Sequence, residues 1–229
     1  MRKFLLSFLF IFLISFFLEA QRRYGSIDKR STSTGTIIFS LGPEYCFADT
    51  KESALSQNIS NNIDFSVGFQ IRYPSNFGYK YQINYTNITG SDGSSKSRSY
   101  SFASKIWQIS AQGEYAFKWG RSFGHSAPPH SIYLFLGIGI LNCTANLNYD
   151  QRANYSYITS YNNQSNVSAI VPLGLGYQYN FNNNILIGLE YNLRRSLSDY
   201  LDGFKPPYPA SKSNDMLIGI SFTVGYKLF

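Results

Sequence analysis

The segment IDFSVGFQIRY, residues 63–73, places an apolar side chain at every second position. Ile, Phe, Val or Tyr fills each odd-numbered position, and Asp, Ser, Gly, Gln or Arg fills each even-numbered one. A helix would need apolar residues three and four positions apart. A spacing of two therefore predicts a β-strand with one apolar face and one polar face.

The same alternation recurs in seven other segments: residues 37–44, 77–86, 107–117, 132–140, 171–181, 185–194 and 218–228. Where it is complete, the apolar face is tall enough for the ~9–11 residues that a tilted strand needs to cross a bilayer. We therefore predict an all-β fold, an eight-stranded antiparallel up-and-down transmembrane β-barrel of OmpA-like size.

The strands of a soluble β-sandwich or a lipocalin-like barrel can show the same alternation of apolar and polar residues, so alternation alone does not identify a membrane barrel. Here the polar faces are rich in Gly, Ser, Gln and Asn, which fit a narrow lumen, and the composition is 17% aromatic but only 14% charged. Aromatic residues also gather at strand ends, as at Tyr73 with Phe77 and at Tyr115 with Phe117. Such rings form girdles at membrane interfaces, so the pattern favours the membrane barrel.

The first twenty residues predict a signal peptide, residues 1–20. Arg2 and Lys3 precede an apolar run that ends at Leu18, and Ala20 is a small residue at the cleavage position. The run is short for an uncleaved membrane helix, which is the competing interpretation. We expect a periplasmic lead-in over residues 21–35 and the barrel over 36–229, in the outer membrane of a diderm bacterium. An even strand count places both termini in the periplasm.

The predicted connections alternate in length. Residues 74–76 and 182–184 form tight turns, whereas the connections near 47–60, 88–100, 145–165 and 197–215 are long and polar. Short periplasmic turns and long outer loops are typical of such barrels. The connection at residues 118–130 is the exception, because it is long yet lies on the side of the short turns.

Alternation assigns eight charged side chains, four acidic and four basic, to the lumen. These are Glu44, Asp64, Arg72, Lys80, Glu114, Glu190, Arg194 and Lys227. Unpaired buried charge is strongly unfavourable, so an equal number of each sign indicates a salt-bridge network that fills the lumen. An ion path is the alternative, but it needs a wider lumen than eight strands provide.

Few residues offer catalytic or metal-binding chemistry. The two histidines, His125 and His130, fall in the long turn and are interpreted as ordinary turn residues, and no cofactor or metal site is expected. Cys46 and Cys143 lie near the outer ends of roughly opposite strands, which favours two separate thiols over a disulfide. Phe229 is out of phase with the last strand, so it is either an extra terminal residue or follows a bulge near Gly225.

Several stretches of the chain resemble the PorG-like family of small outer-membrane barrels associated with type IX secretion. The resemblance spans about residues 36–229 and rests on YLFLGIG (133–139), IVPLGLGY (170–177), residues 184–191 and residues 219–229. Its most specific part is Asp199, Tyr200, Leu201 and Asp202. The resemblance implies a non-enzymatic barrel that ties a periplasmic ring of secretion proteins to the outer membrane. It points to the long turn as a partner contact, with the candidate residues Trp119, Arg121, His125, Pro128 and Pro129; an irregular turn is the plainer interpretation.

Three classes of function remain open at this point. The chain is expected to be a secretion anchor, or else a general structural or surface-binding barrel that acts through its outer loops. A lipid-modifying enzyme is the least supported. Outer-membrane lipid and lipopolysaccharide are expected partners of either barrel, periplasmic secretion-ring proteins are partners of the anchor, and nucleic acid is not expected because the chain is exported.

Overall fold

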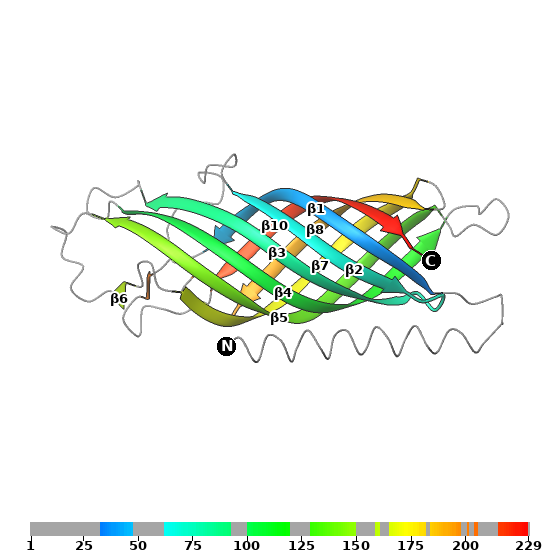
Figure 1. Ribbon diagram of the computed structural model, residues 1–229, viewed down its shortest axis with the longest axis horizontal. Coiled ribbons are helices and arrows are strands. Elements are labelled where there is room, and N and C mark those ends of the chain that lie inside the picture. Colours follow the sequence, from blue (N-terminus) through cyan, green and yellow to red (C-terminus); the bar gives the residue numbers. More distant parts are fainter. Residues whose placement is uncertain are drawn as a thin grey trace. The chain divides into compact units, whose positions relative to one another are not determined.

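The computed structural model describes residues 33–47, 62–92, 100–119, 129–149, 159–160, 165–181, 184–197, 201, 204–205 and 215–228. Within them, eight strands form a closed barrel in which each strand pairs antiparallel with the next, and the last pairs with the first (Figure 1). The strands are β1 (Thr34–Phe47), β2 (Ile63–Arg72), β3 (Phe77–Asp92), β4 (Tyr100–Trp119), β5 (His130–Tyr149), β7 (Ser165–Asn180), β8 (Ile185–Ser196) and β10 (Met216–Lys227). The predicted eight-stranded barrel is confirmed.

The two faces of the strands have the polarity of a transmembrane barrel. In β4, Trp107 and Ile109 are exposed on the outside, whereas Gln108 and Glu114 are buried inside. A lipocalin-like barrel would place apolar residues inside and polar residues outside. The outer surface carries an apolar band instead, which a bilayer can cover.

The two ends of the barrel differ. β1 begins and β10 ends at one end, which we call the turn end; the opposite end is the loop end. The turn between β2 and β3, at the turn end, is tight: the Tyr73 backbone N–H donates to the Phe77 carbonyl (2.9 Å), and Asn76 adopts a positive φ of 71°. Asn tolerates this left-handed conformation better than most residues.

At the loop end, β3, β4 and β5 reach further than predicted (Figure 1). The predicted loops at 88–100 and 145–165 were partly wrong, since β3 continues to Asp92 and β5 to Tyr149. Alternation persists there, but its polarity reverses: Phe102 and Leu141 face inward and are buried, while Lys105 and Asn146 are exposed. The predicted strands end where this reversal begins, because they were identified by apolar residues that face outward.

A second, two-stranded sheet joins β6 (Thr159–Ser160) to β9 (Phe204–Lys205). It links two connections that were predicted as loops, and strands of two residues are too short to show a period.

The register of β10 runs unbroken through Gly225 to Lys227, so the structure contradicts a bulge there; Phe229 lies outside the described residues. β1 begins at Thr34, slightly before the predicted boundary at 36, and residues 1–32 lie outside the described part. The described residues contain no helix that is long and apolar enough to span a membrane.

Candidate functional site

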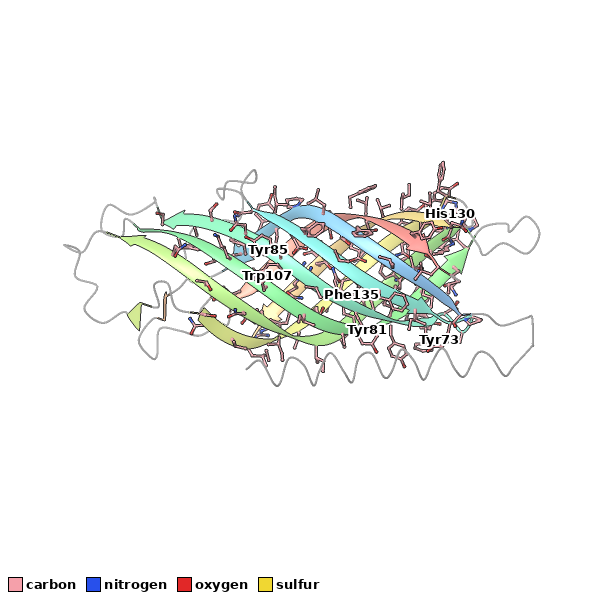
Figure 2. All side chains as sticks on the ribbon, in the orientation of Figure 1. Tyr73, Tyr81, Tyr85, Trp107, His130 and Phe135 are labelled. Carbon is pink, nitrogen blue, oxygen red and sulfur yellow. The ribbon has the colours of Figure 1, made fainter. Side chains whose placement is uncertain are left out.

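The lumen brings together seven of the eight charged side chains that alternation assigned to it. Five ion pairs join Glu44, Asp64, Arg72, Lys80, Glu114, Glu190 and Arg194. They form two groups along the barrel axis, one around Arg194 toward the loop end and one around Lys80 toward the turn end. Figure 2 shows the side chains on the barrel.

Arg194 on β8 lies between two carboxylates. Its guanidinium nitrogens are 2.7 Å from the Asp64 carboxylate and 3.3 Å from that of Glu44. Asp64 accepts further hydrogen bonds from the Thr86 hydroxyl (2.6 Å) and the Asn84 amide (3.2 Å). Burying these charges is tolerable only because each has close partners of opposite charge or hydrogen-bond donors.

Lys80 on β3 occupies the corresponding position in the second group. Its ammonium nitrogen is 2.8 Å from the Glu190 carboxylate and 3.8 Å from that of Glu114. The Tyr133 hydroxyl also donates to Glu190 (2.5 Å), and Arg72 pairs with Glu114 at 3.3 Å. Lys80 is only 1% exposed, so its ion pairs are shielded from solvent.

Two aromatic rings on the lumen face of β5 fill the space beside this group. The Lys80 ammonium lies 4.6 Å from the centre of the Phe135 ring, and the Arg72 guanidinium lies 4.6 Å from that of Tyr133, which are cation–π distances. Their space comes from Gly174 and Gly176 on β7, because a Cβ on either glycine would overlap a ring atom of Phe135 or Tyr133. The lumen is thus packed by pairing large side chains with glycines.

Two further charged side chains in the lumen were not predicted from the sequence. Lys118 continues the inward phase of β4 past Glu114, and Asp215 continues that of β10 before Leu217, so longer strands would have revealed both. The eighth predicted charge, Lys227, is half-buried and joins no ion pair with another described residue.

With these two residues included, the lumen charges are separated along the axis. The loop-end side holds three carboxylates and one cation, which are Glu44, Asp64, Asp215 and Arg194. The turn-end side holds four cations and two carboxylates, which are Arg72, Lys80, Lys118, Lys227, Glu114 and Glu190. The lumen is therefore neutral in sum but positive at the turn end and negative at the loop end.

An apolar cluster fills the lumen at the loop end. It comprises Cys46, Ile88, Phe102, Ile106, Leu141, Cys143, Ile170, Leu201 and Leu217. Both cysteines are buried in it and no disulfide joins them, as expected for two separate thiols. The cluster was not predicted, because the inward face was expected to be polar throughout.

Leu201 enters this cluster from the connection between β8 and β10. Its backbone N–H donates to the Asp215 carboxylate (2.7 Å), and its carbonyl accepts from the Ser104 hydroxyl (2.5 Å). Its side chain is 1% exposed. Leu201 thus acts as a plug at the loop end; the other motif residues Asp199, Tyr200 and Asp202 lie outside the described residues.

The candidate partner contact is only partly described. Trp119 ends β4, is 44% exposed, and stacks on His130 with ring centres 5.8 Å apart. His130 in turn meets the Tyr177 hydroxyl at 2.8 Å, so it belongs to a strand and an aromatic girdle rather than to a turn. The Pro129 carbonyl accepts from the Asn180 N–H (2.7 Å). Arg121, His125 and Pro128 lie outside the described residues.

The aromatic girdle continues around the turn end. Phe77 packs against Tyr115, and Tyr115 against Phe117, with ring centres 4.9 Å apart in each pair. A second contact, between Tyr85 and Trp107 at 4.8 Å, lies nearer the loop end (Figure 2). Aromatic residues at two heights bound an apolar band between them, as in membrane barrels.

The chemistry of the lumen is that of a filled, charge-paired interior. In the part of the chain that the structure describes, no three His, Cys, Asp or Glu side chains are grouped as metal ligands. Buried side chains occur at every level of the lumen, from Ser131 through Lys80 and Arg194 to Leu201, and each is at most 4% exposed. These side chains are therefore shielded from solvent.

Several solved structures of outer-membrane proteins are similar to this chain. A major outer membrane protein from Thermus thermophilus is similar with a TM-score of 0.54 and 10% identity, over 86% of this chain and 100% of that one. Ail, the attachment invasion locus protein of Yersinia pestis, has a TM-score of 0.48 and 14% identity over 86% and 99%. Neisserial surface protein A has a TM-score of 0.47 and 13% identity over 86% and 99%. Likeness at such low identity concerns the fold alone.

Comparison of the sequence identifies the family of the chain. No curated protein matches the chain. A protein family described as "Domain of unknown function (DUF6089)" matches residues 32–222, which include all eight barrel strands at least in part. The chain therefore belongs to the DUF6089 family.

Proposed function

We propose that the protein is a non-enzymatic outer-membrane barrel that anchors a periplasmic secretion assembly, the role that its PorG-like sequence features imply. The observation that carries the proposal is the filled lumen: ion pairs around Lys80 and Arg194 and the Leu201 plug occupy it. A barrel with a filled lumen is suited to holding partners at its ends rather than to conducting solutes.

The inequality of the two ends supports an orientation with the turn end in the periplasm. The turns at the turn end are mostly short, as at 73–76, whereas β4 and β5, of 20 residues each, extend the barrel at the loop end. This asymmetry is typical of outer-membrane barrels. In this orientation Trp119 and Pro129 face the periplasmic side, and the loop end meets lipopolysaccharide.

Deletion of the gene tests the anchor directly. We expect loss of secreted cargo from the culture medium, and recovery of periplasmic ring proteins when tagged barrel is purified after cross-linking. Re-expression of the wild-type barrel should restore both. Normal export of cargo in the deletion strain would contradict the anchor.

A second candidate function is binding at the cell surface through the loop end. The β6–β9 pairing favours it, because it ties the connection between β5 and β7 to that between β8 and β10. The tie holds residues 159–160 of the first connection against residues 204–205 of the second. Replacing residues 150–164 with a short Gly-Ser linker should then abolish adhesion while cargo export stays normal. Unchanged adhesion in that variant would exclude this candidate.

A further inference from the structure

The turn-end mouth of the lumen carries positive charge that the described residues do not neutralise. Arg72 and Lys80 are balanced by Glu114 and Glu190, but Lys118 and Lys227 have no carboxylate partner among the described residues. The Lys118 ammonium donates to the Tyr73 carbonyl, at 3.3 Å. Both lysines are half-buried, and Arg72 lies within electrostatic range of each. We call Arg72, Lys118 and Lys227 the mouth cations.

The mouth cations come from three separate parts of the wall. Lys118 lies on β4 and Lys227 on β10, which are four strands apart in either direction around the closed barrel, and Arg72 lies on β2 between them. All three share the lumen-facing phase of their strands. They therefore face the turn end of the lumen instead of lipid, and the two lysines lie on opposite sides of the barrel wall.

The three connections between strands at this end contribute no acidic side chain. Residues 74–76, 120–129 and 181–184 contain no Asp or Glu, although Arg121 adds another positive charge. Half-buried cations repel one another and favour an external anion. Since the two lysines stand on opposite walls, that anion should carry several charges along an extended backbone.

We infer that the mouth cations bind an acidic peptide segment of a periplasmic protein, which lies across the turn end of the barrel. The proposed function enters this inference in one respect only, which is the side of the membrane on which the partner lies. The negative loop end would repel the same segment, so binding is confined to one end. Carboxylates of the segment would meet Lys118 and Lys227 on opposite sides of the barrel wall, and Arg72 on β2 lies between them around the wall.

Binding of a hexaglutamate peptide to the full-length barrel, refolded in an uncharged detergent, tests this inference. The peptide carries a neutral dye, and its affinity is read from fluorescence anisotropy. We expect the K118Q/K227Q variant to bind about tenfold more weakly, equivalent to about 1.4 kcal/mol, because it removes two partly exposed ion pairs. Added salt should weaken wild-type binding. K105Q is the matched control, since Lys105 is an exposed lysine on β4 at the loop end.

Three results would overturn the inference: equal affinity of wild type and K118Q/K227Q, an equal loss in K105Q, or complete displacement of the peptide by phosphatidylglycerol added to the micelles. The last would assign the mouth to a lipid headgroup. A heat-dependent shift in gel mobility verifies that each variant is folded. The assay uses purified protein, so peptide binding together with normal cargo export in the deletion strain would contradict the anchor but not the anion site.

Discussion

Arg194 is held in the lumen by two carboxylates that could not remain buried without it. Its guanidinium lies 2.7 Å from Asp64 and 3.3 Å from Glu44, and these three side chains are at most 4% exposed. Removing one member of such a group leaves the other charges buried without a counter-ion. The resulting loss of folding stability is larger than the net stability that the intact group contributes. The neighbouring Arg195 is exposed and points away from the lumen.

Replacing Arg194 with methionine should therefore lower the free energy of unfolding by about 3–5 kcal/mol, because Glu44 and Asp64 lose their counter-ion. Urea unfolding of the refolded barrel, followed by the fluorescence of Trp107 and Trp119, measures the change. Arg195→Met is the control and should alter it by less than about 0.5 kcal/mol. Equal urea midpoints for the two variants would show that the Arg194 pairs contribute nothing.

Gly176 is required for a different reason, which is space. A methyl group at this position would overlap the Tyr133 ring, whereas one at Gly113 on the outer face of β4 would come no closer than 3.9 Å to another atom. Gly176→Ala should destabilise the barrel by about 1–3 kcal/mol, the usual cost of overpacking. Gly113→Ala should have no such effect. Thermal unfolding of the two variants checks this; equal melting temperatures would mean that the ring is not an obstacle at position 176.

β4 and β5 behave as membrane strands along one part of their length and as strands of a soluble barrel along the other. Ile109 and Ile138 face outward in the apolar band, but Phe102 and Leu141 face inward at the loop end. The reversal follows from the surroundings, because the outer face meets water once the strands leave the bilayer. The connection between β8 and β10 completes this second core by adding Leu201.

Leu201→Gly should open the loop end, because truncating a buried leucine costs about 2–5 kcal/mol and local opening becomes correspondingly more frequent. Cys46 and Cys143 report on the opening, since they are 2% and 1% exposed in the same cluster. Their labelling by a maleimide should become at least about tenfold faster. Leu197→Gly, at a position that is 58% exposed, should leave the rate unchanged. An unchanged rate in Leu201→Gly would mean that Leu201 does not seal the cluster.

The whole barrel combines an apolar band around its exterior with an interior closed at several levels. Ser131, Lys80, Arg194 and Leu201 are each at most 4% exposed. Refolded protein in a planar bilayer should therefore produce no discrete conductance steps, whereas a porin added to the same membrane should produce them. Reproducible ohmic steps from the purified barrel would contradict the filled lumen and the anchor proposal that depends on it.

The amino-acid order alone was sufficient for the membrane part of the fold. Alternation depends only on neighbouring residues and on which face meets lipid, so the strand at 63–73, the antiparallel barrel and the inward phase of Lys80 and Arg194 could be predicted. Beyond the bilayer the same rule reversed its polarity, and Phe102 and Leu141 were consequently left out of the predicted strands.

Pairing in space depends on the register and closure of the barrel, which no local pattern contains. Lys80 meets Glu190 across 110 positions of the chain, and Arg194 meets Glu44 across 150. Register and closure also bring Leu201 into the loop end of the lumen and place the positive charge of Lys118 and Lys227 at the turn end. A period of two states only which side of the wall a residue faces; its height in the barrel and its neighbours across the lumen are set when eight strands close around one axis.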